Sequence, residues 1–218
     1  MNELVFILHI FIVITFVFAA LRLGKSALIA FLAMQGVFAN LFVVKQMPLF
    51  GFSVTCSDVF AIGAILSLNL LQEYYGKEAA KQAVKVSFLA LFFFLCAVQI
   101  HLLYFPTQAD ITQRAFETVF SHSLRIVFSS VATFFIVQLW DVRFFGWLKG
   151  KLPIRVMISL LFSQLLDTVL FSFLGLYGIV ESVFDIIAIS FAIKCIIIFT
   201  TSPFVAFSRR FLKNEVSV

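Results

Sequence analysis

Long apolar stretches separated by short polar connections occupy almost the whole chain. Seven can be marked, at residues 4–21, 26–48, 53–73, 84–105, 118–141, 154–178 and 182–207. A helix of about 18 to 26 residues, rising ~1.5 Å per residue, can cross a hydrocarbon layer of about 30 Å. The pattern predicts an all-α fold, a polytopic membrane helix bundle of six to seven transmembrane helices, within one integral membrane domain over residues 1–218.

The segment at 53–73 is the most polar of the seven. It contains serine, threonine and carboxamide side chains, among them Asn69 and Gln72. A broken or re-entrant helix is tolerated at membrane depth where it lines a polar cavity. The sequence therefore leaves open whether this segment is a full span. The longest polar connection is predicted at about 106–117.

Basic residues are distributed unevenly between the two sides of the predicted bundle. If seven helices alternate in direction, one side holds Arg22, Lys25, Lys77, Lys81, Lys85, Arg143, Lys149, Lys151, Arg155, Arg209, Arg210 and Lys213. The other side and its flanks hold Lys45, Arg114 and Arg125. Because cytoplasmic loops are enriched in Lys and Arg, we expect a multi-pass inner-membrane protein with its N-terminus outside and its C-terminus in the cytoplasm.

Composition supports the membrane class. The chain is 62% hydrophobic, whereas soluble domains have about 45–50% apolar residues. The net charge of +5 fits cytoplasmic loops and does not indicate nucleic-acid binding. The sequence contains no phosphate-binding GxxxxGK[ST] loop and no Cys/His spacing typical of a metal site, so we predict no cofactor and no metal.

Ionisable residues inside the apolar segments are the main candidates for function. Asp167 and Gln164 are three residues apart and share one helix face. Lys194 lies equally far into the next segment, so we expect it near the membrane midplane beside Asp167. A buried acid costs roughly 2.5–3.5 kcal/mol on insertion scales. The two residues form either a neutralising structural pair or a functional site, which would be a ligand site or a proton-coupled switch, and these alternatives stay open here.

Further polar side chains lie on other predicted helices. Asn69, Gln72 and Glu73 share a face at i, i+3 and i+4 spacing, which also suits an interfacial helix end. The remaining candidates are Asn40, Arg125, Gln138 and Arg155. Carboxylates and carboxamides can read the donor–acceptor edge of a heterocycle, and Phe and Tyr can stack on its faces. This chemistry suits a carrier of a small polar solute.

Several stretches resemble one family, the queuosine-precursor transporters, also called the vitamin-uptake-like family. They are NLFVVK at 40–45, NLLQEYYG at 69–76, Arg125 with Gln138 and Asp141, SQLLDT at 163–168, and Lys194 with SPF at 202–204. The match covers roughly residues 38–205, and SQLLDT is its most specific part. The chain departs from the family pattern at Asn69, Gln72 and Thr201, where the family has Asp, Thr and an acid.

The resemblance implies import of a 7-deazaguanine, either preQ0, preQ1 or queuine, for queuosine modification of tRNA. It also implies a likeness to the substrate-binding subunits of energy-coupling-factor transporters. We expect Asp167 and Glu73 to accept hydrogen bonds from the base edge. Supporting roles fall to Gln164, Gln138, Asn69, Gln72 and Asn40, with Arg125, Arg155 and Lys194 as charge balancers or gates.

Three alternatives stay open. The chain could be the substrate-binding subunit of a multi-component transporter that needs an ATPase module, a membrane enzyme, or an assembly protein without transport activity. An enzyme would need a nucleophile–base set at one depth, whereas the three histidines lie near segment ends, so we predict that the chain is not an enzyme. Expected partners are the lipid bilayer and a deazapurine, and a homo-oligomer is left open.

Overall fold

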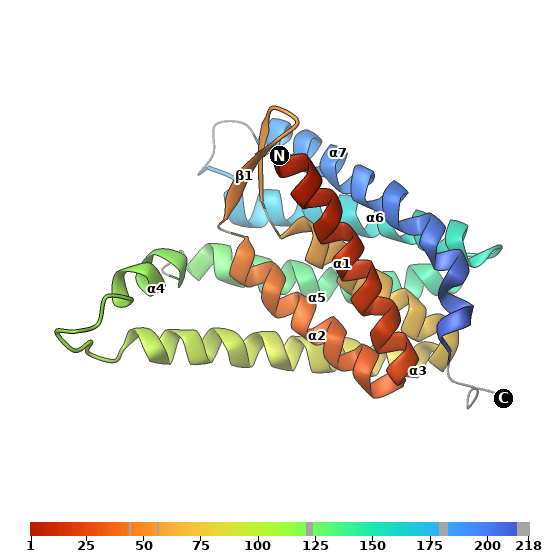
Figure 1. Ribbon diagram of the computed structural model, residues 1–218, viewed down its shortest axis with the longest axis horizontal. Coiled ribbons are helices and arrows are strands. Elements are labelled where there is room, and N and C mark those ends of the chain that lie inside the picture. Colours follow the sequence, from red (N-terminus) through yellow and green to blue (C-terminus); the bar gives the residue numbers. More distant parts are fainter. Residues whose placement is uncertain (44, 56, 121–123, 179–182, 213–218) are drawn as a thin grey trace.

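The computed structural model describes residues 1–43, 45–55, 57–120, 124–178 and 183–212, and most of them are helical (Figure 1). The helices are α1 (Asn2–Leu23), α2 (Lys25–Phe42), α3 (Asp58–Leu102), α4 (Gln113–Phe120), α5 (Leu124–Trp147), α6 (Leu152–Phe171) and α7 (Val183–Thr201). A π-helical turn, η1 (Ser172–Leu176), extends α6, and a 3-10 helix, η2 (Ser202–Phe211), follows α7. The strands are β1 (Gln46–Leu49) and β2 (Phe52–Thr55).

Helix α3 reverses direction at Gly76. Its 45 residues would extend about 68 Å if straight, more than twice a hydrocarbon layer of ~30 Å. Gly76 has φ 83° and ψ 168°, and the chain turns back there. The second limb then runs back along α5, where Phe88 contacts Phe135 with ring centroids 4.8 Å apart. Near the far end of this limb, Phe94 contacts Phe120 of α4 at 6.1 Å. Within the described residues, six helices are long and apolar enough to span a membrane, and the doubled α3 provides two of the crossings, which confirms the predicted bundle.

A β-hairpin replaces part of two predicted helices. Helix α2 ends at Phe42, so the predicted segment 26–48 extends too far. Strands β1 and β2 pair antiparallel, and their turn contains Phe50 and Gly51, both with positive φ, which is the conformation favoured in two-residue hairpin turns. The helix predicted from residue 53 begins instead at Asp58 and continues unbroken to the reversal.

Other boundaries shift in smaller ways. The predicted connection at 106–117 overlaps α4, which also takes the first residues of predicted segment 118–141. Helix α5 continues past residue 141 to Trp147. The end of predicted segment 182–207 is the 3-10 helix η2, with Pro203 in its first turn. Residue 182, where that segment was predicted to begin, lies outside the described residues.

The bundle has two distinct ends. At one end the α1–α2 turn, the Gly76 reversal and the α5–α6 connection meet η2, and Tyr74 and Ser208 share a hydrogen bond of 2.6 Å there. We call this the basic end, because it contains the predicted basic side of the bundle apart from Lys213, which is outside the described residues. The opposite, hairpin end contains the β-hairpin, α4 and η1 (Figure 1).

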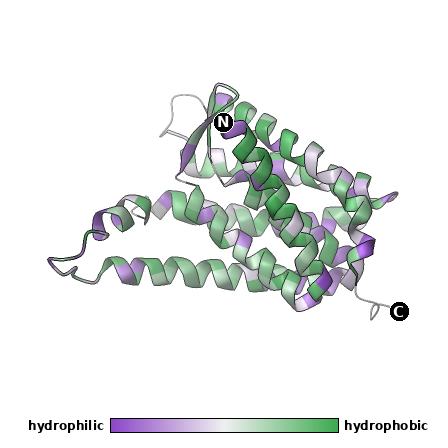
Figure 2. Cartoon of the chain, in the orientation of Figure 1, coloured by the Kyte–Doolittle hydropathy of each residue, from purple (hydrophilic) through white to green (hydrophobic). Residues whose placement is uncertain are grey.

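The outer surface between these ends is apolar. Hydrophobic residues cover most of each long helix in Figure 2, with hydrophilic ones concentrated toward the ends and turns. Phe93, Leu89 and Phe128 are 71%, 67% and 66% exposed on this surface. Apolar exposure of this extent marks a surface that meets lipid or another apolar partner.

Replacing Gly76 with Ala is expected to destabilise the protein by about 1–3 kcal/mol, because only glycine adopts this backbone conformation without strain. A Cβ at residue 76 would meet no atom within 4 Å, so the cost comes from the backbone alone. The unfolding midpoint in detergent should fall for Gly76→Ala and stay unchanged for the neighbouring, exposed Lys77→Ala. An unchanged midpoint for Gly76→Ala would contradict the strained reversal.

Candidate functional site

A polar cavity of about 140 Å³ lies between α2, α3, α5, α6 and α7, toward the hairpin end. Asp58, the first residue of α3, and Thr55 of β2 line it on one side, and Asp167 lies opposite, near the carboxyl end of α6. The other polar lining residues are Asn40, Ser57, Ser130, Thr133, Thr168, Ser172, Ser190 and Lys194. The rings of Phe134 and Phe171 also line the cavity. The arrangement offers hydrogen-bonding groups together with flat apolar surfaces.

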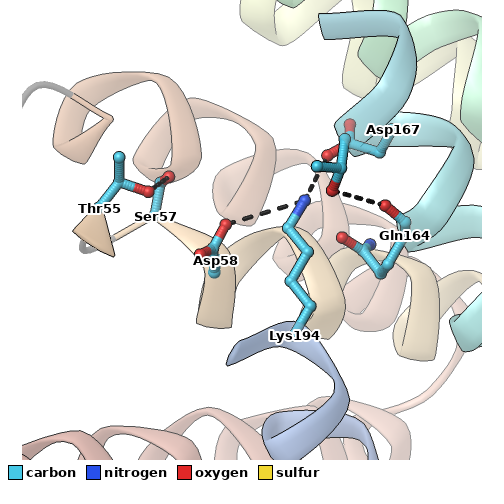
Figure 3. A network of polar contacts seen from close by, with 7 residues as sticks. Thr55, Ser57, Asp58, Gln164, Asp167 and Lys194 are labelled. Atoms are coloured by element: carbon cyan, nitrogen blue, oxygen red, sulfur yellow. Dashed lines mark hydrogen bonds and ion pairs between the residues drawn. The ribbon is translucent and has the colours of Figure 1, made fainter. Parts of the chain in front are cut away.

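An ion cluster lies in the cavity wall (Figure 3). The Lys194 ammonium is 2.7 Å from Asp167 Oδ2 and 3.8 Å from Asp58 Oδ1. Lys194 is only 4% exposed, so its charge depends on these two carboxylates for compensation. The expected pairing of Lys194 with Asp167 is therefore present, with a second acid that was not expected.

Asp58 is the main residue that the sequence reasoning missed. It follows serine and threonine residues in the most polar predicted segment, 53–73, and is not among the candidate residues named from the sequence. Reversal of α3 at Gly76 and the antiparallel course of α6 bring the start of α3 to the end of α6. A signal was present, because Asp58 is the only acid in segment 53–73 before Glu73.

Two other predicted residues lie at or beside the cavity. Asn40 lines it, donates a 3.0 Å hydrogen bond to the Gly36 carbonyl and accepts one of 2.7 Å from Ser130. Gln164 lies behind the wall, 1% exposed, and its backbone carbonyl accepts a hydrogen bond from Thr168 (Figure 3). The Gln164 Oε1 atom has no partner among the described residues.

Glu73 lies far from this cavity. It is about 22 Å along the first limb of α3 from Asp58 at ~1.5 Å per residue. At the basic end it forms a 2.7 Å ion pair with Arg155, whose guanidinium lies 4.4 Å from the centre of the Phe145 ring. Gln72 is also on this side, donating a 2.9 Å hydrogen bond to the Val142 carbonyl. The structure therefore does not bring Glu73 and Asp167 to one binding site.

Between the cavity and the Glu73–Arg155 pair lies a set of buried polar side chains from α3, α5 and α6. Gln138 accepts a 3.0 Å hydrogen bond from Ser87 of the second α3 limb. Asp141 Oδ1 accepts from Ser159 and, at 2.6 Å, from Ser163. Asn69 is fully buried, and neither atom of its carboxamide has a partner among the described residues.

The pattern of these buried groups follows from helix spacing. Ser159 and Ser163 are four residues apart and face α5 together. The Asp141 Oδ2 and Gln138 Nε2 atoms also lack partners in the described part of the chain. Buried polar groups are normally satisfied, so this interior suits water or a passing polar ligand better than a dry core.

Arg125 is outside the cavity. Its side chain is exposed at the hairpin end and donates a 2.8 Å hydrogen bond to the Leu174 carbonyl. This contact connects α5 to the π-helical turn η1. Among the described residues, no group of three His, Cys, Asp or Glu side chains could hold a metal ion.

The fold and this site define a class: a multi-pass helical membrane protein with an ion cluster at a polar cavity among its helices. Such intramembrane charges mark paths for solutes or protons in membrane proteins. Residues 55–208 match a family described as "Putative vitamin uptake transporter". The chain belongs to this family, which places it among transporters.

A curated relative agrees with the family match. The chain is 29% identical over 218 residues to a "Probable queuosine precursor transporter" of Bacillus subtilis (strain 168), with 96% of this chain and 93% of the relative covered. No solved structure matches the chain, so the expected likeness to energy-coupling-factor subunits stays a prediction.

Proposed function

We propose that this chain imports a queuosine precursor, a 7-deazaguanine, across the inner membrane for tRNA modification. The observation that carries the proposal is the carboxylate-lined cavity in a chain whose relative bears the name of such a transporter. The edge of a guanine-like base has two adjacent N–H donors, and one carboxylate can accept hydrogen bonds from both. Asp167 is our candidate acceptor, and Phe134 and Phe171 are candidates to cover the faces of the base.

The size of the cavity supports a small ligand. Pockets for drug-sized molecules measure about 300–1,000 Å³, and this one has about 140 Å³. A single fused heterocycle suits that space better than a nucleoside or a large vitamin. The buried polar groups between the cavity and the Glu73–Arg155 pair then form the exit route in an alternating-access cycle.

The charge distribution supports an orientation for this cycle. The basic end faces the cytoplasm under the positive-inside rule, which puts the hairpin end and the N-terminus outside. The cavity near the hairpin end then receives the ligand from outside. The Glu73–Arg155 ion pair lies on the cytoplasmic side, where it serves as a gate.

Restoration of tRNA queuosine tests the proposal. The chain is expressed in a host that lacks both queuosine synthesis and its own importer, and each precursor is fed separately. Queuosine should appear with at least one precursor and be absent from cells with the empty vector. No queuosine with any precursor, despite the protein being present in the membrane, would overturn the proposal.

Uptake by the purified chain in proteoliposomes separates a self-sufficient transporter from the subunit of a multi-component one. A self-sufficient transporter gives saturable uptake without any ATPase. Saturable binding without uptake would instead assign the chain the role of a substrate-binding subunit. Absence of both binding and uptake would favour an assembly protein.

A further inference from the structure

The cavity wall contains one more acid than base. Asp58 and Asp167 both line it, and Lys194 is the only cationic lining residue in the described part of the chain. With all three ionised, the cluster has a net charge of −1. A charge imbalance in the interior of a membrane protein is costly unless a further cation compensates it.

Of the two carboxylates, Asp58 has the negative charge that Lys194 compensates less. The Lys194 ammonium hydrogen-bonds Asp167 at 2.7 Å but is 3.8 Å from Asp58, beyond hydrogen-bond reach. The nearby hydroxyls of Thr55 and Ser57 bond to each other at 3.0 Å (Figure 3). Apart from Lys194, no described cation lies within 4 Å of Asp58.

The other charged groups around the cluster do not remove this imbalance. Arg125, on α5, does not line the cavity, and its side chain is exposed and bonded to Leu174. Arg155 pairs with Glu73 at the basic end. Asp141 adds an acid farther inside the bundle, where its carboxylate accepts hydrogen bonds from two serine hydroxyls.

We propose that Asp58 makes the site selective for a cationic ligand, a 7-deazaguanine that carries a protonated aliphatic amine. This inference rests on the proposed function and narrows its ligand. An aliphatic amine is protonated at neutral pH, as lysine is. Once it binds, two carboxylates face two cations, whereas a neutral base leaves the extra negative charge in place. A charge-assisted hydrogen bond to the amine also exceeds a neutral one in strength.

Two compounds of similar shape test the selectivity: 7-aminomethyl-7-deazaguanine, which is cationic, and 7-cyano-7-deazaguanine, which is neutral. Initial uptake rates are measured in proteoliposomes, with each compound alone and in competition. The wild-type chain should favour the amine by about tenfold or more, as expected for one strong charge-assisted contact. Asp58→Asn should bring the ratio close to one, mainly by slowing uptake of the amine.

In Asp58→Asn the charge of Lys194 is balanced by that of Asp167, so the variant is expected to accumulate normally. The amount of protein in the membrane checks this. Glu78→Gln is the matched control, because Glu78 is an exposed acid at the basic end whose partner is Lys81. Its ratio should equal that of the wild type. Equal slowing of both compounds by Asp58→Asn would point to a structural role and overturn the inference.

The wild-type ratio decides the question even without a variant. Equal rates for the two compounds, or a preference for the cyano compound, would overturn selectivity for a cation while leaving the proposed function standing. Uptake of neither compound nor of queuine would overturn the proposed function itself. The two failures are therefore distinguishable in the same assay.

Discussion

Replacing Asp167 with Asn should lower precursor uptake by about 30-fold or more at an unchanged level of protein in the membrane. The proposed bond from the base edge to Asp167 is a hydrogen bond to a charged group, which contributes about 1.5–3 kcal/mol, and each 1.4 kcal/mol is a factor of ten. Asp167 holds Lys194 at 2.7 Å and faces the cavity. Asparagine keeps the shape of the side chain and one acceptor but removes the charge.

Initial uptake rates in proteoliposomes, normalised to the amount of reconstituted protein, measure this effect. Glu78→Gln serves as the control, since it removes an acid from the exposed surface. Ser190→Ala is a second control, because it removes a hydroxyl from the cavity wall without altering the ion cluster. Uptake by Asp167→Asn at the wild-type rate would exclude this carboxylate from ligand binding.

Replacing Lys194 with Met should destabilise the protein by about 3–5 kcal/mol, because it leaves the buried Asp58 and the partly buried Asp167 without their ammonium group. Lower accumulation in the membrane and a lower unfolding midpoint in detergent are the expected results. The cost arises from the uncompensated acids rather than from the loss of the lysine stem, since methionine fills much of the same space.

A triple variant separates these causes. Adding Asp58→Asn and Asp167→Asn to Lys194→Met removes every charge from the cluster, and replacing a buried ion cluster by uncharged groups is often neutral for stability. The triple variant should regain accumulation and remain inactive in uptake. A single Lys194→Met variant as stable as the wild type would show that the acids do not depend on Lys194.

The sequence predicted the helix bundle well because hydrophobic length is a strong signal in membranes. Asp167 and Lys194 could be matched in depth because each lies at a similar distance into adjacent antiparallel segments. The hairpin was missed for a physical reason. Its strands are short, and their apolar residues continue the hydrophobic segments on either side. The turn depends on a phenylalanine at positive φ, a conformation that non-glycine residues rarely adopt.

The site was harder to predict than the fold. Helix periodicity places Glu73 on a polar face but does not show which residue of another helix contacts it. In the structure its ion-pair partner is Arg155. Asp58 required knowledge of where α3 begins, because the predicted segment starts at residue 53 whereas the helix starts at Asp58. The buried set around Asp141 depends on α5 continuing to Trp147, which moves Asp141 from a helix end to a helix interior.

The β-hairpin has a consequence for the depth of the ion cluster. Two strands alone leave unpaired N–H and C=O groups along both outer edges, and such groups do not occur in contact with lipid within the hydrocarbon region. The hairpin therefore marks the level of the water boundary, and Asp58 follows three residues after β2. The charged cluster is then closer to one surface than the midplane position expected from the sequence. The ligand would therefore lose most of its bound water near the point of entry and cross most of the low-dielectric layer afterwards.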